Sequence, residues 1–517
     1  MGAAPAAVMA VTGSFRGREM VGYAAGMAAP RAPAILLSLV VSASGWLRAA
    51  DARADEDEPA SEDEAAAAVA FPDQRFGPRY VIQDIQVRGN HKTQRSIIAA
   101  EVAALGLVQG ASVDASDPRV EAVRYRLLAL GYFLDVRLSV TRGTNRGGVV
   151  LVVDVEERGT IVINELFPST SAATAFWGGA DASETNFLGR GINLGAGFVA
   201  STTPVVPGAT AGVGVRLRAG VPPIGGPYGL SLTATGLYND GSEFYRVMGA
   251  DDDADPKNFV ASRVKRAGGV LGFGKDFRSR LHLGLDFREE AITAELPDVL
   301  TLAQPVDFMV KDGTSRLGTV AASIDYDTRS DPILPRSGMR LSLSVEAATS
   351  LLGSSYDYLK TTAEASYYRP MPHGHALGFH LFAGAIAGDP PYFDRYFIGD
   401  LNLLLPRRAL GINFSTLPSR DLLDTSIAHH RYDHFAGRVL VEYAIPVWRR
   451  RGFVYGGDAF LAVGLLGMAS RGDFIPPGES GLGALPIDLT GDLGLRLDTY
   501  VGIFTISIAN ALSRTSF

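Results

Sequence analysis

The chain has 517 residues, a formal net charge of −7, 47% hydrophobic residues and no cysteine. A net charge this small for the length argues against nucleic acid as the main partner. Without cysteine the chain forms neither disulfides nor thiolate metal sites. The length allows several domains or one very large sheet.

The first 77 residues read as a leader followed by a linker. The apolar stretch RAPAILLSLVVSASGW follows basic residues and precedes the small-residue sequence Ala52-Arg53-Ala54. This order is typical of a secretory signal, so residues 1–54 are predicted to be a signal peptide, with its start left open between Met1, Met20 and Met27. A membrane anchor is the alternative, but the apolar core is short. Residues 55–77 predict a solvated acidic linker.

Residues 78–158 predict a compact α/β domain. YVIQDIQVRGN alternates as a strand, and two helical segments follow. We expect Thr93 to cap the first helix and Gly106 to end it, and Asp117 to cap the second, with Pro118 at its first position. LDVRLSVTRG and GVVLVVDVEERG then predict two strands, so the order is strand, helix, helix, strand, strand.

Residues 159–517 repeat one pattern, an alternation of apolar and polar side chains. In LHLGLDFR the apolar and polar sets are Leu281, Leu283, Leu285 and Phe287 against His282, Gly284, Asp286 and Arg288. A soluble sandwich also alternates, but charges and glycines crowd the polar face here, and the segments are long enough to cross a membrane at a tilt. The predicted fold class is therefore an α+β domain followed by an antiparallel transmembrane β-barrel. The pattern shows about fifteen candidate strands, whereas an even number, about 16, is expected.

The first domain resembles a POTRA domain. The matching landmarks are Gly89 and Asn90 after the first strand, and Gly131, Tyr132 and Phe133 after the second helix. Gly131, Tyr132 and Phe133 also make sense as a helix stop followed by core aromatics. The resemblance implies that a free strand edge of this domain captures extended peptides by β-augmentation.

The segment DYDTRSDPILPRSGMRLSLSVE resembles the barrel signature of the BamA/TamA superfamily of outer-membrane assembly proteins, of which the chain would be a divergent member with a single POTRA domain. The matching residues are Asp327, Thr328, Arg329, Asp331, Pro332, Pro335, Gly338 and Arg340. Proline fixes φ, glycine accepts unusual backbone angles and charges stay in water, so we interpret this segment as a structural turn. SETNFLGRGINLGAGF, with Asn186, Phe187, Gly189 and Gly191, and VEYAIPV are similar to other parts of the same family.

The family's sixth loop folds into the lumen and locks an Arg-Gly-Phe motif against acidic residues, and YFDRYFIGDLNLLLPRRALGINF stands in its place. The resemblance implies a lock between Arg407 or Arg408 and Glu442. However, Ala409 and Leu410 replace the glycine and the aromatic residue, and the second acid, expected near Ala462, is missing. The alternative is that both arginines are ordinary loop charges.

The segment AHHRYDHF holds three histidines, His429, His430 and His434. We interpret it as a polar loop and predict no metal and no cofactor. No arrangement of nucleophile and base stands out either, so no enzymatic activity is predicted.

The resemblance implies a protein of the bacterial outer membrane, with its POTRA domain in the periplasm, that assembles, inserts or translocates client polypeptides. The expected partners are unfolded outer-membrane or secreted polypeptides, outer-membrane lipid, and periplasmic chaperones or accessory lipoproteins, but no nucleic acid. One alternative is a passive outer-membrane pore or structural surface protein that has lost assembly activity. Another is the secretion of one dedicated partner.

Overall fold

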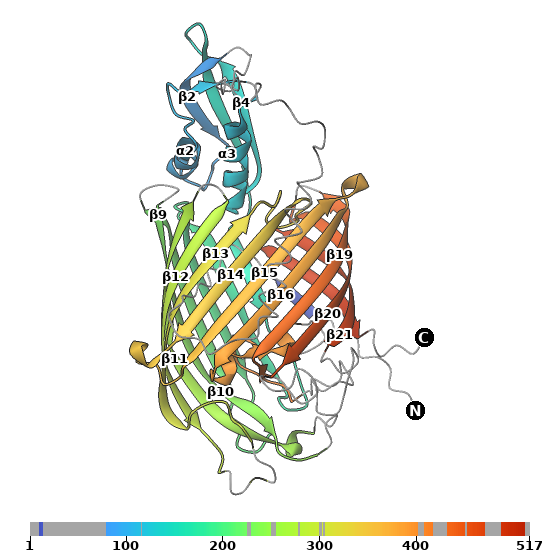
Figure 1. Ribbon diagram of the computed structural model, residues 1–517. Helices are drawn as coiled ribbons and strands as arrows, with labels where there is room; N and C mark the ends of the chain where they lie inside the picture. Colours follow the sequence, from blue (N-terminus) through green and yellow to red (C-terminus); the bar gives the residue numbers. More distant parts are fainter. Residues whose placement is uncertain are drawn as a thin grey trace, which may run out of the picture.

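The computed structural model describes residues 10–13, 79–114, 116–224, 229–249, 255–277, 280–298, 302, 306–401, 408–416, 432–449, 452–470 and 487–511. A small domain stands on one end of a long barrel (Figure 1). The acidic linker and all of the predicted signal peptide except residues 10–13 lie outside the described residues, so both stay predictions.

The small domain is a four-stranded sheet with two helices. Its elements are β2 (Tyr80–Arg88), α2 (Arg95–Ala104), β3 (Ser112–Val113), α3 (Pro118–Ala129), β4 (Phe133–Arg142) and β5 (Gly148–Glu157). The strand order is β3-β2-β5-β4, with β2 parallel to β5. The predicted order of strands and helices is confirmed, with the two-residue β3 as an addition.

The start of α3 agrees with the sequence prediction, whereas the start of α2 does not. The Asp117 carboxylate accepts a hydrogen bond from the Arg119 backbone N–H at 2.9 Å, and Pro118 opens α3 as predicted. The predicted cap of α2 is wrong, because the helix begins one residue later, after Gln94. Thr93 is instead drawn into contacts with the barrel, described below. The core between helices and sheet contains Ile98, Val102, Val123, Leu127 and Val136.

The barrel wall is a single antiparallel sheet. Its strands are β6 (Ile161–Leu166), β7 (Trp177–Phe187), β8 (Ile192–Ser201), β9 (Val213–Ile224), β10 (Leu230–Arg246), β11 (Phe259–Phe277), β12 (Leu281–Glu295), β13 (Gly313–Asp327), β14 (Gly338–Ala348), β15 (Tyr358–Pro370), β16 (Ala376–Gly388), β19 (Phe435–Arg449), β20 (Val454–Ala469), β21 (Ile487–Thr499) and β22 (Gly502–Ala511). A short strand, β1 (Ala10–Gly13), pairs antiparallel with β22 and completes a sheet of 16 strands.

The barrel is nearly closed at a seam between β6 and β22. At the end that carries the small domain, the Ile163 backbone N–H donates to the Val501 carbonyl at 2.8 Å. Farther along, β1 lies beside both β22 and β6. Because consecutive strands reverse direction, the first and last of the fifteen strands between residues 161 and 511 run the same way. The fifteen candidate strands are confirmed, and sixteen are reached only with β1.

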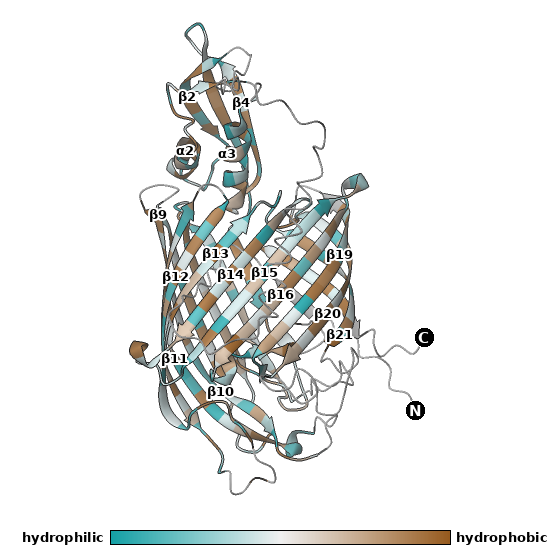
Figure 2. Cartoon of the chain, in the orientation of Figure 1, coloured by the Kyte–Doolittle hydropathy of each residue, from teal (hydrophilic) through white to brown (hydrophobic). Residues whose placement is uncertain are grey.

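The wall places apolar side chains outside and charges inside. On β12, Leu285 and Phe287 are 37% and 45% exposed, whereas Asp286 and Glu290 are each 4% exposed. The brown and teal bands along the strands show the same alternation (Figure 2). This is the reverse of a soluble fold and matches a wall that faces lipid. No helix among the described residues is long and apolar enough to cross a membrane.

The turn between β13 and β14 is held by its own side chains. The Asp327 carboxylate accepts from the Arg329 backbone N–H at 3.0 Å and from its guanidinium at 2.7 Å. Asp331 accepts from the Ile333 backbone N–H at 2.7 Å. At Gly338 φ is +93°, and an added Cβ would lie 2.2 Å from the Thr328 carbonyl oxygen, so only glycine fits.

The rest of this signature also stays within the barrel. The Pro332 carbonyl accepts from the Arg329 guanidinium at 3.3 Å, and Pro335 is buried. Arg336 forms an ion pair with Asp458 on β20. These contacts are what a structural turn requires.

Candidate functional site

The first part of the site is the junction between the small domain and the barrel, which begins at the loop after β2. At Gly89 φ is +82°, and an added Cβ would lie 1.9 Å from the Val155 carbonyl oxygen. Asn90 donates from Nδ2 to the Thr93 carbonyl at 3.1 Å. These two landmarks therefore shape a tight loop over residues 89–94.

Glu157, at the end of β5, holds this loop. Its carboxylate accepts from the backbone N–H groups of His91, Lys92 and Thr93 at 3.1, 2.8 and 2.6 Å. Burial acts to raise the pKa of Glu157, but the three donors outweigh it and hold the pKa below the ordinary 4.5. The three hydrogen bonds to Glu157 therefore favour its charged form.

The loop docks on the turn between β7 and β8. Asn186 donates from Nδ2 to the Thr93 hydroxyl at 2.9 Å, and the Gln94 backbone N–H donates to the Gly189 carbonyl at 2.9 Å. At Gly189 φ is +69°, and an added Cβ would lie 1.9 Å from the Lys92 carbonyl oxygen. The loop after β2 and the turn between β7 and β8, two segments that the sequence analysis singled out separately, are therefore in contact.

The same domain also docks on the turn between β21 and β22. Lys92 donates to the Tyr500 hydroxyl at 3.3 Å. Arg158 forms an ion pair with Asp498 at 2.6 Å, with side chains only 4% and 9% exposed. The Gly159 backbone N–H donates to the Tyr455 hydroxyl at 3.1 Å. The small domain is thus bound on both sides of the seam.

The three landmarks after α3 lie between the domain core and this junction. Gly131, with φ +77°, ends the helix. Phe133 is 3% exposed in the core, and the Tyr132 carbonyl accepts from the Arg158 backbone N–H at 3.0 Å. Tyr132 therefore couples the core to the linker that enters the barrel.

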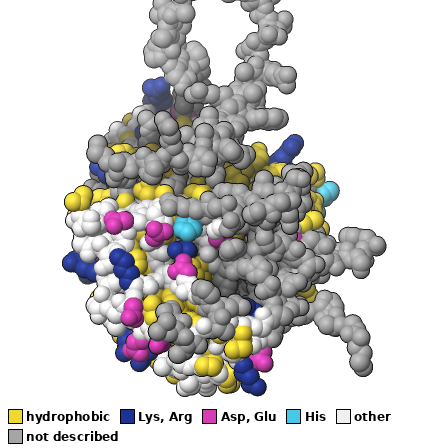
Figure 3. Space-filling view, turned by 60° about the horizontal axis from the view of Figure 1, so that its bottom comes forward, with side chains coloured by type: hydrophobic (Ala, Val, Ile, Leu, Met, Phe, Trp, Pro, Cys, Tyr) yellow, Lys and Arg dark blue, Asp and Glu magenta, His cyan; other side chains and the backbone are white. Residues whose placement is uncertain are grey.

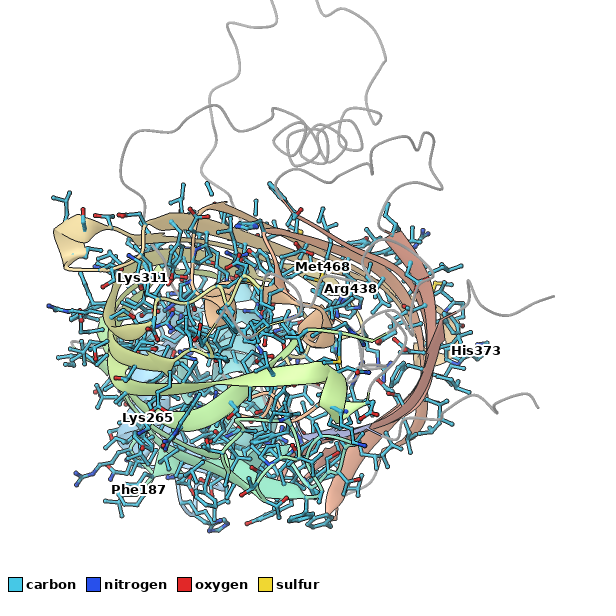
Figure 4. All side chains as sticks on the ribbon, turned by 90° about the horizontal axis from the view of Figure 1, so that it is seen from below. Phe187, Lys265, Lys311, His373, Arg438 and Met468 are labelled. Carbon is cyan, nitrogen blue, oxygen red and sulfur yellow. The ribbon has the colours of Figure 1, made fainter. Side chains whose placement is uncertain are left out.

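The second part of the site is the segment between β16 and β19, residues 389–434, which we call the lumen loop. Its described pieces include β17 (Tyr396–Phe397), α4 (Ile398–Leu401) and β18 (Tyr432–Asp433). Seen along the barrel from the end remote from the small domain, Arg438 of β19 lies inside the ring of strands and His373 lies at its outer rim (Figure 4). Arg438 donates to the Leu401 carbonyl at 3.0 Å, which ties the loop to the wall.

A charged anchor fixes one side of the lumen loop. The Asp394 carboxylate accepts from Arg288 of β12 at 2.9 Å and from the Tyr358 hydroxyl of β15 at 2.9 Å. Arg288 also pairs with Glu290 at 2.6 Å, and Glu346, 0% exposed, accepts from Tyr358 at 2.8 Å. The loop supplies the acid and the wall supplies the arginine. The sequence interpretation missed this pair, although Arg288 was already placed on the polar face of its strand.

The predicted lock between Arg408 and Glu442 is not formed. Arg408 pairs with Asp400 of the same loop and donates to the Phe393 carbonyl at 3.2 Å. Glu442 pairs with Arg496 of β21 at 2.8 Å. Arg496 crosses the intervening strand β20 to reach it. The other predicted arginine, Arg407, lies outside the described residues.

The position of the missing second acid is next to the ion pair between Glu442 and Arg496. The position expected to hold it, Ala462, lies directly opposite Glu442 on β20. A small side chain there leaves space for Arg496, whose guanidinium also lies 5.0 Å from the centre of the Phe460 ring. An arginine from the wall thus stands where the resemblance expects one from the loop.

The histidine segment lies mostly outside the described residues, which include His434 but not His429 or His430. Among the residues that the structure describes, no group of three or more His, Asp or Glu side chains could hold a metal ion. On the end of the barrel remote from the small domain, the described part shows charged side chains of both signs interspersed (Figure 3).

Comparison with known families gives two matches. The Omp85 superfamily domain matches residues 186–404, from the β7–β8 turn into the lumen loop. The POTRA model, described as a surface antigen variable number repeat, matches residues 80–158. A search of curated proteins found no match.

A search of solved structures gives, among others, BamA from Haemophilus ducreyi lacking POTRA domains 1–3, at 16% identity and a TM-score of 0.45, covering 84% of this chain and 82% of that one. CdiB from Acinetobacter baumannii follows at 11% identity, TM-score 0.46 and coverage of 84% and 74%. CdiB from Escherichia coli has 10% identity, TM-score 0.44 and coverage of 93% and 99%.

The two matched regions together cover the small domain, the turn between β7 and β8 and most of the barrel wall. Members of this family are outer-membrane β-barrels of the insertase and transporter kind, and they handle unfolded polypeptides. Residues 186–404 therefore form an Omp85 superfamily domain, and one POTRA domain precedes the barrel among the residues that the structure describes.

Proposed function

We propose that this protein captures unfolded polypeptides in the periplasm and assembles, inserts or translocates them at the outer membrane. The observation that carries the proposal is the seam, because it is the one break in the continuous pairing of the described wall. The POTRA domain is bound to the strand ends on both sides of it, so a captured chain is delivered there. Periplasmic chaperones or accessory lipoproteins would bring such chains to the POTRA domain.

The capture surface in this proposal is β4. This strand forms the edge of the POTRA sheet, opposite the short β3. An edge strand offers unpaired N–H and C=O groups to an extended peptide. Ser139, Val140 and Thr141 are exposed along it, so a client strand can approach without displacing a core side chain.

The direction of the strands supports the seam as the exit. Because β6 and β22 run the same way, one antiparallel strand fits between them. In the structure of the full chain, β1 takes that place, and it belongs to the segment predicted to be a signal peptide. A strand in this position exchanges backbone hydrogen bonds with the wall while its side chains reach lipid. Lipid leaves no other partner for its backbone groups.

A passive pore that has lost assembly activity is the second candidate, and the absent pair between Arg408 and Glu442 favours it. The lumen loop argues the other way, since its contacts with β12 and β15 keep it inside the barrel. A passive pore would give large, steady conductance in planar bilayers that Arg408→Ala leaves unchanged. Secretion of one dedicated partner would change the level of one secreted protein only. None of these roles involves a chemical reaction of the chain.

Depletion followed by outer-membrane proteomics tests the proposal. We expect several β-barrel proteins to fall in abundance, and complementation by a chain lacking residues 79–158 to fail. A photoreactive residue at Ser139 should crosslink to client polypeptides, whereas one at Glu121 on the exposed side of α3 should not. An unchanged outer-membrane proteome after depletion would reject the assembly role.

A further inference from the structure

The inner wall of β8, β9 and β10, together with the residue just before β9, contains a recess lined by glycines, which we call the glycine recess. Its members are Gly197, Gly212, Gly214 and Gly241. Inward positions on a barrel strand normally carry side chains. Their absence at four neighbouring positions leaves room for another part of the chain.

The tip of the lumen loop fills this recess. Ala409 and Ile412 exchange two backbone hydrogen bonds of 2.9 and 3.0 Å, with Leu410 at φ +49° and Gly411 at φ +86° between them. Positive φ at both central residues makes a tight two-residue hairpin. The hairpin projects apolar side chains from a loop that is otherwise anchored by charge.

Three apolar side chains of the tip are buried against the inner wall of the barrel. Leu410, Ile412 and Phe414 are 5%, 6% and 3% exposed. The Phe414 ring stacks on Trp177 of β7 with ring centres 5.3 Å apart. Burial removes the apolar surface of all three side chains from water, so the tip is held by the hydrophobic effect.

The fit depends on the missing side chains. A Cβ added at Gly241 would lie 2.8 Å from Cγ2 of Ile412, and its three nearest atoms all belong to Ile412. One added at Gly212 would lie 2.6 Å from the Phe414 ring. By contrast, a Cβ added at Gly236, on the outward face of the same strand β10, would meet nothing within 4 Å.

Two hydrogen bonds close the rim of the recess. Asn239 of β10 donates from Nδ2 to the Leu410 carbonyl at 2.8 Å. The Ser171 hydroxyl donates to the Phe414 carbonyl at 2.7 Å. The backbone of the tip is therefore satisfied where it leaves water.

We propose that the glycine recess is a latch that holds the lumen loop across the channel, independently of the charged anchor on β12 and β15. The recess lies on strands close to the seam, so release of the tip frees the side of the lumen where the wall is discontinuous. The occupant is the segment 409–414 of this chain. The closing role of the latch does not depend on the proposed function. Only the coupling of the latch to client passage depends on that function.

A bump-and-hole experiment tests the latch in the full chain. Gly241→Val should push Ile412 out of the recess and raise the open time of the channel in planar bilayers at least about tenfold. Adding Ile412→Ala to Gly241→Val should restore closure, because the smaller side chain makes room for the valine. Gly236→Val is the matched control and should behave as the unmodified protein.

Equal open times for Gly241→Val and Gly236→Val would overturn the latch, and so would a double variant that stays open. If Gly241→Val does not fold, Ile412→Ser alone decides, with a raised open time expected and an unchanged one contradicting the proposal. These measurements need no client. An unchanged proteome after depletion would therefore remove the assembly role while leaving the latch intact.

Discussion

The POTRA domain and the barrel are built from the same residue types with opposite sidedness. In the POTRA domain Ile98 and Leu127 are 0% exposed and charged side chains mostly face water, whereas on the barrel Leu285 and Phe287 face outward and Arg288, Glu290 and Glu346 are enclosed. The difference reflects the solvent around each part. Water surrounds the first, while lipid surrounds the second and polar groups gather in its lumen.

The largest expected effect lies in the enclosed charges of the barrel. Arg288→Ala removes the arginine partner of Asp394 and leaves that buried carboxylate uncompensated, whereas Glu290 keeps its second partner, Arg266, at 2.8 Å. The expected cost is about 3–5 kcal/mol in the free energy of unfolding. Denaturant unfolding in lipid vesicles measures this. The control is Arg137→Ala in the POTRA domain, where the exposed pair with Asp135 should leave the unfolding midpoint unchanged.

Equal effects of these two substitutions would remove the distinction between enclosed and exposed charges. In that case the lumen loop would not be held by Asp394, and the charged anchor would lose its role.

The next effect concerns the outward apolar side chains. Leu285→Arg places a charge in lipid and should lower barrel stability by about 2–4 kcal/mol near the membrane midplane, with a smaller loss near either surface. Val108→Arg changes a POTRA residue that is 43% exposed, and should stay within about 0.5 kcal/mol because water surrounds it. Reversed magnitudes in parallel denaturant titrations would mean that the barrel wall faces water.

A smaller effect tests how the POTRA loop is held at the junction. Because the pKa of Glu157 is lower in the folded state, its contribution is present above the unfolded value near 4.5 and is lost as the pH falls through the folded value. Glu157→Gln should cost about 1 kcal/mol, given its partial exposure, and should flatten this pH dependence. Thermal unfolding of the POTRA transition from pH 3 to 7 measures it. Glu121→Gln, a substitution on the exposed side of α3, should keep the wild-type slope.

The smallest effect is expected at the other side of the seam. The hydrogen bond to Tyr500 raises the pKa of Lys92 above its ordinary 10.5, so this contact contributes at every pH below that value. Tyr500→Phe should weaken POTRA docking by less than about 1 kcal/mol, since Lys92 is largely exposed. Limited proteolysis near residue 159 should show only a slight increase in cleavage. Complete release of the domain would mean that the Arg158–Asp498 pair does not carry the docking.

The sequence predicted those features that depend on local pattern. Alternation gave the strands and the sidedness of the wall, and the Asp117-Pro118 pair gave the start of α3. Contacts between distant segments were not accessible in the same way. Nothing in the order of residues shows that Thr93 contacts Asn186 and does not cap α2. Nor does it show that Arg496 reaches across β20 past Ala462 and pairs with Glu442 in place of Arg408.

The lumen loop shows the same limit. Its position between two strands was evident from the sequence, but its fold depends on which wall residues are small. The run of inward glycines on β8 to β10 was visible as a high glycine content, yet its meaning as a recess required the position of Ile412. Side-chain volume across a lumen is a property of the register between strands, which a single sequence does not provide.

The division of side chains between lipid and lumen can be measured directly because the chain has no cysteine. Single cysteines on β20 at Leu461, Val463 and Leu465, which are 56%, 42% and 47% exposed, would be compared with cysteines at Ala462 and Leu466, which are 1% and 2% exposed. A fluorescent label on each would be tested for quenching by nitroxide-bearing lipids in vesicles. We predict strong quenching at 461, 463 and 465 and little at 462 and 466. Equal quenching at all five positions, or none at the odd ones, would contradict a lipid-facing barrel.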